Sequence, residues 1–196
     1  MQKDTLNLMR QIQADKQYQK IVNNQIKIEF EKIKNQYISE FINNPITVEI
    51  NGGISSQNIS NTLGGITNLY SFIGFDEGTD PIKPILELLE KSNYRILFNN
   101  QAIDSTIIFD IPTAKEIFDI TPMPWAIGRS WARGIETGIS GLGYYLKKIK
   151  NSRSGIGIQS STNQIRTGVS FKNTKYISDL LNRFNKDLKN LNINNI

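Results

Sequence analysis

The sequence predicts an α+β domain: a small, mostly antiparallel sheet flanked by a long N-terminal helix and a C-terminal helix, with long glycine-rich loops. Residues 1–44 contain neither glycine nor proline, and all fourteen glycines lie between positions 52 and 168. Helical patterns therefore occupy both ends of the chain and enclose a middle region of strands and loops. A length of 196 residues suits one domain, and we divide it into an N-terminal extension, 1–24, and a single domain, 25–196.

The N-terminal helix is predicted from one apolar stripe. Five apolar residues recur at spacings of three and four, as on one face of an α-helix: Ile26, Phe30, Ile33, Tyr37 and Phe41. The sequence Asn43-Asn44-Pro45 ends this helix, because the residue before a proline avoids the α region. Residues 1–24 are less regular, and they form either a separate helix or an arm that orders against a partner.

The middle region begins with a predicted strand at 46–50, where β-branched residues alternate with others. An uncharged loop follows at 51–66 and contains two glycine pairs, but no Gly-Lys-Ser/Thr sequence that would make it a phosphate-binding loop. The apolar stretch 69–75 is predicted to be a buried strand or a loop anchor. Asp80 is predicted to cap a helix that begins at Pro81, because the spacing of the nearby acids does not match a calcium loop.

Two hairpins and two helices are predicted in the second half. The stretches 94–98 and 106–111 form the first hairpin, and Asn99-Asn100-Gln101 lies in its connection. Thr113 caps a short helix that ends before Pro122. A second hairpin joins 156–159 to 164–171. Thr174 then caps the last helix, whose apolar stripe is Ile177, Leu180, Leu181, Phe184, Leu188 and Leu191.

Composition excludes several kinds of site. The chain contains no cysteine and no histidine, so zinc sites with these ligands, thiol nucleophiles and Ser-His-Asp triads are excluded, although a carboxylate site for magnesium or calcium stays possible. No apolar run is long enough for a transmembrane helix, and the N-terminus lacks the apolar region of a signal peptide. From position 147 onward there are ten basic and two acidic residues. This basic region indicates either contact with nucleic acid or an acidic protein, or a solvated helix face with lysines.

The most unusual stretch is 122–145, which contains both tryptophans, five glycines and only three charged residues. Trp and Arg are enriched at the energetic centres of protein interfaces, and no nucleophile here has a base beside it. Residues 129–136 are predicted to form two helical turns, with Arg129 and Arg133 on one face and an ion pair between Arg133 and Glu136. We expect the tryptophans to pack this loop and to form a contact surface.

The chain resembles the neck or tail-completion proteins of tailed bacteriophages, which join the head connector to the tail. The resemblance lies in three blocks in the same order: NPITVEINGG…SNTLGGITNLYSFIGFDEGTDPI, PMPWAIGRSWARGIETGISGLGYYL, and SRSGIGIQ…IRTGVSF with the YISDLLNRF helix. In that family a long helix precedes a small sheet, and a glycine loop precedes a later segment with an aromatic residue, a Glu and a Gly. The proline that usually precedes the family's glycine loop is not in place here, and the Ser/Asn-rich stretch is longer.

The resemblance implies a structural virion protein, made in the host cytoplasm, without enzymatic activity, cofactor or membrane contact. Such proteins form homo-oligomeric rings, commonly of twelve or six copies, whose subunits make head-to-tail contacts. The implied partners are other copies, the portal or connector or its adaptor, and tail proteins. The implied interface residues are Trp125, Arg129, Trp131, Arg133, Glu136, Gly64, Gly65 and Leu69. The implied DNA-facing residues, for non-specific contact with packaged DNA, are Lys147, Lys148, Lys150 and Arg153.

Two other functions remain open from the sequence. A non-specific nucleic-acid-binding module would use the basic C-terminal region and the aromatic residues within it, which are Tyr144, Tyr145, Phe171 and Tyr176. An enzyme would need carboxylates as acid and base, from the group Asp76, Glu77 and Asp80 or the group Asp104, Asp110 and Glu116. No spacing among these acids favours a particular catalytic pair.

Overall fold

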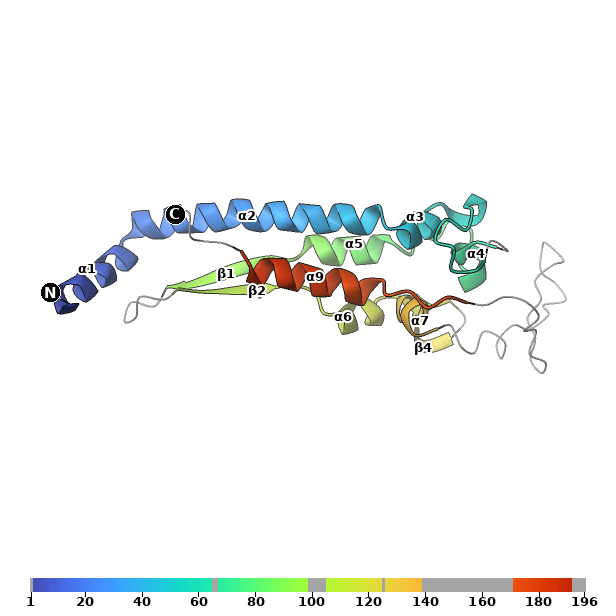
Figure 1. Cartoon of the computed structure of the whole chain (residues 1–196). Coiled ribbons are helices and arrows are strands. Elements are labelled where there is room, and N and C mark those ends of the chain that lie inside the picture. Colours follow the sequence, from blue (N-terminus) through green and yellow to red (C-terminus); the bar gives the residue numbers. More distant parts are fainter. Residues whose placement is uncertain (1, 65–66, 99–104, 125, 139–170, 192–196) are drawn as a thin grey trace.

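The computed structural model describes residues 2–64, 67–98, 105–124, 126–138 and 171–191, and it confirms the α+β class. Figure 1 shows an elongated molecule with helix α2 (Lys16–Ile42) along one side and helix α9 (Ile177–Lys189), near the other end of the sequence, running beside it. Helix α1 (Gln2–Ala14) continues beyond the N-terminal end of α2. The 27 residues of α2 give it a length of about 40 Å.

The core lies between α2 and the elements packed beneath it. The predicted stripe of α2 is confirmed, since Ile26, Phe30, Tyr37 and Phe41 are buried and Ile33 packs against them. The stripe of α9 is confirmed too, and the rings of Tyr37 and Phe184 stack with centroids 4.7 Å apart. The two helices are also tied by polar contacts at their surface, where Tyr37 Oη donates to Asp187 over 2.5 Å and Arg183 pairs with Glu40 over 2.6 Å.

The N-terminal region is helical, but α1 contributes little to the core. Helix α2 begins at Lys16, where Asp15 caps it by accepting from Gln17 N, so the predicted division after residue 24 falls within α2. Three apolar side chains of α1 are open to solvent, with exposed fractions of 36% for Leu6, 58% for Leu8 and 45% for Ile12.

The predicted strand at 46–50 is wrong, because this stretch forms helix α3 (Pro45–Asn51). Asn44 caps the helix by accepting from Ile46 N over 3.0 Å, and Pro45 occupies its first turn, where the missing N–H costs nothing. The side chains buried by α3 are Ile46, Thr47, Glu49 and Ile50. A cap and a proline at the first turn therefore outweigh the β-branched alternation. A 3-10 turn, η1 (Gly53–Ser55), follows.

The next stretch is also helical, forming α4 (Leu69–Ile73) between the Asn68 cap and Gly74, whose φ is +83°. Helix α5 (Lys83–Glu90) begins two residues later than expected. The predicted N-cap is corrected too, because Ile82 holds that position and no side chain caps it. Asp80 instead lies just before the helix, where its carboxylate accepts from Ile82 N and Lys83 N at 3.1 and 3.0 Å.

The strands form two separate two-stranded antiparallel sheets. The first predicted hairpin is confirmed as β1 (Asn93–Phe98) with β2 (Ser105–Asp110), in a register that pairs Asn93 with Asp110 and Phe98 with Ser105. The connection at 99–101 lies outside the described residues. Thr113 caps α6 (Ala114–Asp119) in a capping box with Glu116, as predicted. The short strands β3 (Pro122–Met123) and β4 (Ala126–Ser130) were not predicted, and helix α7 (Trp131–Thr137) follows them directly.

Candidate interaction site around α7

The polar contacts of Thr121 and Ser130 fix the start of α7. Trp131 N donates to Thr121 O over 2.9 Å, and Thr121 Oγ1 donates to Ile117 O at the end of α6 over 2.8 Å. The hydroxyls of Thr121 and Ser130 lie 2.7 Å apart, and Ser130 Oγ also accepts from Arg133 N as the N-cap of α7. The segment is therefore part of the folded core and not a loose loop.

The indole of Trp131 lies inside the subunit, with 1% of its surface exposed. It makes an edge-to-face contact with Phe75, with ring centroids 5.8 Å apart. This corrects the expectation that Trp131 forms an interface, because a side chain without free surface cannot contact a neighbouring copy in this fold. Leu69 is corrected for the same reason, since it is fully buried. Trp125, the other tryptophan, lies outside the described residues.

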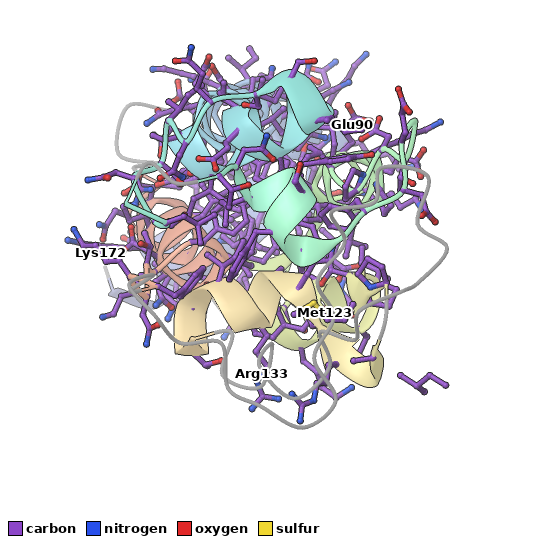
Figure 2. The ribbon with its side chains drawn as sticks, turned by 90° about the vertical axis from the view of Figure 1, so that its right-hand side faces the viewer. Glu90, Met123, Arg133 and Lys172 are labelled. Carbon is purple, nitrogen blue, oxygen red and sulfur yellow. The ribbon has the colours of Figure 1, made fainter. Side chains whose placement is uncertain are left out.

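A cleft of about 490 Å³ opens between α6, the β3–β4 pair and α7. Arg129 and Arg133 line it, and both side chains are exposed. Figure 2 shows Arg133 at the outer surface, with Met123 closer to the interior. Three glycines also line the cleft, at positions 128, 134 and 138. The backbone is open at Gly128, where a Cβ would meet no atom within 4 Å, whereas a Cβ at Gly138 would lie 2.9 Å from Asn173 Oδ1.

The two arginines reach the cleft from different elements. Arg129 belongs to β4 and Arg133 to α7, which corrects the expectation that they share one helix face. Strand β4 pairs irregularly with β3, since Pro122 faces Ser130 and Met123 faces Ala126. The residues between these pairs bulge outward, with Gly128 at a φ of +76° and Ile127 fully exposed at 107%. The bulge is what brings Arg129 to the cleft.

Asp119 is the acidic residue at the edge of this cleft. Its Oδ2 lies 2.6 Å from Lys115 Nζ, one helical turn away on α6. The pKa of Lys115 is raised, first by this hydrogen bond and then by the charge of Asp119. The charged residues that line the cleft are therefore two arginines and one aspartate, and Asp119 is paired with Lys115, which does not line it.

Glu136 binds to the start of α9, and this corrects the predicted pair with Arg133. Its carboxylate accepts from Ser178 N over 2.6 Å, from Tyr176 N over 3.3 Å and from the Ser178 hydroxyl. Thr174 was predicted to cap α9, but its hydroxyl donates to Lys172 O instead. A carboxylate from α7 thus accepts the free N–H groups of a helix forty residues later in the chain.

The loop 51–66 is organised by Glu49, which the sequence analysis did not single out. This carboxylate is fully buried and accepts from Asn58 Nδ2, Ser60 N and Leu69 N at distances of 2.7–2.8 Å. The signal in the sequence was a lone acid among apolar residues, followed by sixteen uncharged residues whose N–H groups need acceptors. Gly64 is exposed on this loop with a φ of +62°, and Gly65 lies outside the described residues.

Of the remaining candidate carboxylates, Asp110 and Glu116 line one small pocket of about 140 Å³ together. Asp76, Glu77 and Asp80 are exposed, and Glu116 belongs to the capping box of α6. No group of three or more Asp or Glu side chains among the described residues is arranged to hold a metal ion. Within the same residues, every helix is too short or too polar to cross a bilayer. The outside residues include Asp104, Lys147, Lys148, Lys150, Arg153 and most of the second predicted hairpin.

Comparison of the chain with models of protein families, with curated proteins and with solved structures finds no match.

Proposed function

We propose that this protein is a structural subunit of the neck of a tailed bacteriophage, where copies form a ring that joins the head connector to the tail. The observation that carries the proposal is the contact between Glu136 and α9. This contact joins the segment 131–138, which contains the aromatic residue, the Glu and the Gly of the resemblance, to the closing helix. The order of elements also agrees with the resemblance, because a long helix comes first, followed by the small sheets and the closing helix.

The described surface supports a role in assembly. Several large apolar side chains have no cover within the subunit, with exposed fractions of 58% for Leu8, 60% for both Ile21 and Ile28, and 107% for Ile127. Helix α1 extends beyond the body (Figure 1), and its side chains Leu6, Leu8 and Ile12 are exposed to solvent. A helix of 13 residues is marginal by itself in water, so a neighbouring copy or an adjoining ring is a natural partner for it.

The proposed location is the virion, after synthesis in the host cytoplasm. Its partners there are other copies of the chain, the portal or connector or its adaptor, and tail proteins. The ring is expected to surround the DNA that passes between head and tail. Residues 139–170 contain five basic and no acidic residues, so the charge of this segment equals the net charge of +5 of the whole chain. Lys147, Lys148, Lys150 and Arg153 belong to this segment and are the proposed DNA-facing residues.

Mass photometry and negative-stain imaging of the purified chain test the proposal. We expect particles of six or twelve times the 22.3 kDa of one chain, and closed rings in the images. The same protein should be found in purified virions at the neck. A chain that stays monomeric at all concentrations and is absent from virions would overturn the proposal.

The excess of basic residues from position 147 onward also favours a second candidate function, that of a non-specific nucleic-acid-binding module. A salt titration of binding to double-stranded DNA separates the two functions. Phosphate contacts release counterions, so a dedicated DNA-binding module binds tightly at about 50 mM salt and loses affinity steeply as salt rises. Absence of binding at about 50 mM salt removes this candidate and leaves the neck proposal intact.

A further inference from the structure

We propose that the cleft lined by Arg129 and Arg133 receives the acidic loop 76–80 of the neighbouring copy, an inference that rests on the proposed ring. The loop carries three acids, Asp76, Glu77 and Asp80, and every residue in it is exposed. The cleft and the loop are therefore opposite in charge, and each is open to solvent in the single subunit.

The acidic loop is held in one shape by the core beneath it. The Tyr70 hydroxyl donates to Asp76 O and, over 3.1 Å, to Thr79 O, while Thr79 N donates to Asp76 O to close a turn. Gly78, at a φ of +84°, permits this turn. The carboxylate of Asp80 is already engaged with Ile82 N and Lys83 N, so Asp76 and Glu77 are the acids that the loop presents. A preformed loop loses little conformational entropy when it binds.

One arginine of the cleft and two acids of the loop have no ion-pair partner within the described residues. No ion pair joins Asp76, Glu77 or Arg133 to another side chain in the described part of the chain. The cleft, at about 490 Å³, has the size of sites that enclose a small ligand or a few side chains. Gly128, where a Cβ would meet no atom within 4 Å, allows the backbone of an incoming turn to approach closely.

The two surfaces belong to different elements but are joined through the core. The loop connects α4 to α5, and the cleft lies between α6, β3–β4 and α7, which run below α5 in Figure 1. Phe75, directly before the loop, packs against Trp131, which stands between the two arginines in the sequence. The buried indole thus fixes the spacing of both surfaces. A head-to-tail contact needs two different surfaces on each copy, and the cleft and the loop are two such surfaces.

The first test uses neutral variants that keep the side-chain shape. A cleft variant carries Arg129→Gln and Arg133→Gln, and a loop variant carries Asp76→Asn and Glu77→Gln. All four side chains are exposed, so both variants should fold, which circular dichroism and thermal unfolding check. We expect each to self-associate at least about tenfold more weakly than wild type in sedimentation velocity. The control variant, Glu29→Gln with Lys32→Gln on α2, should associate as wild type.

Mixing the two variants gives a sharper readout. The cleft variant still offers an intact loop, and the loop variant still offers an intact cleft, so each mixed pair makes one complete contact. We expect a 1:1 mixture to form heterodimers and nothing larger. Since the chain contains no cysteine, Glu77→Cys in one protein and Arg133→Cys in another supply single thiols, and a disulfide should form between the two proteins on oxidation.

The outcomes separate this inference from the proposed function. If wild type forms rings and both charge variants form the same rings, or if the control loses assembly equally, the cleft–loop contact is wrong and the ring stands. If wild type forms only short chains that the variants abolish, the contact stands and the closed ring is wrong. Wild type that never associates, with no disulfide between the cysteine variants, overturns both.

Discussion

Replacing Glu49 by Gln tests whether one buried carboxylate holds the loop 51–66 in place. In the structure Glu49 Oε1 accepts from Asn58 Nδ2 and Leu69 N, while Oε2 accepts from Ser60 N. A glutamine keeps one oxygen and replaces the other by an NH₂ group. In its better orientation the oxygen takes the Oε1 position, so the NH₂ group faces the N–H of Ser60 and neither donor has an acceptor.

The expected loss of stability follows from these two donors without an acceptor. A buried donor without an acceptor costs about 1–3 kcal/mol, so Glu49→Gln should lower the free energy of unfolding by that amount in urea denaturation. For a chain of this size each 1 kcal/mol lowers Tm by about 2–4 °C. Native-state hydrogen exchange should show the Ser60 amide exchanging about tenfold faster for each 1.4 kcal/mol lost locally.

The matched control is Glu87→Gln on α5, where the side chain is 55% exposed and pairs loosely with Lys83 over 3.9 Å. A surface pair of this kind contributes about 0–1 kcal/mol, so this variant should remain close to wild type. If Glu49→Gln has the stability of the control and the Ser60 amide is still protected, the carboxylate does not organise the loop and the reasoning from its contacts is refuted.

Three further predictions concern the segment around α7 and its supports. Trp131→Ala should lower the free energy of unfolding by about 3–5 kcal/mol in urea denaturation, because the indole is 1% exposed. The control Arg133→Ala replaces an exposed side chain and should change the free energy of unfolding by about 0.5 kcal/mol or less. Equal effects of the two substitutions would contradict the burial of Trp131. Glu136→Ala should cost about 0.5–2 kcal/mol, since it removes the acceptor at the start of α9, and exchange of the Ser178 amide should rise with it. The pKa of Glu116 is lowered from 4.5, first by the backbone N–H of Thr113 and then by its hydroxyl. The stability from this shift is present above pH 4.5 and is lost as the pH falls through the lower pKa that Glu116 has in the folded state. The free energy of unfolding of Glu116→Gln should therefore depend less on pH in that acidic range than that of wild type.

The sequence predicted those elements whose signal is periodic over many residues. Two such stripes, from Ile26 to Phe41 and from Ile177 to Leu188, each form a buried helix face. They could be predicted because the same spacing repeats over two or more helical turns. The first hairpin followed from two apolar runs of strand length. Short elements were predicted less well. In α3 the β-branched residues suggested a strand, yet the Asn44 cap and Pro45 decide the conformation of a seven-residue element.

The site predicted in the segment 122–145 stays a prediction, but the structure shows that the contacts of its described residues could not be read from spacing. Arg129 and Arg133 are four apart, as on a helix, yet β4 ends between them and only the bulge at Gly128 brings both to one cleft. Glu136 could pair with Arg133 along a helix, but the N–H groups of α9 take its carboxylate. Both outcomes depend on contacts between residues distant in the sequence, and local spacing carries no information about them.

Trp131 shows why composition alone misassigns such residues. Large aromatic side chains are common both in cores and at the centres of interfaces, because burial rewards the same apolar area in either place. Here the neighbours decide, since Phe75 meets the indole edge-on within the subunit while the flanking Arg129 and Arg133 remain in solvent. In the proposed ring contact, the packing of Trp131 on Phe75, the residue before the acidic loop, holds that loop against the helix that carries Arg133, and every copy has the same arrangement.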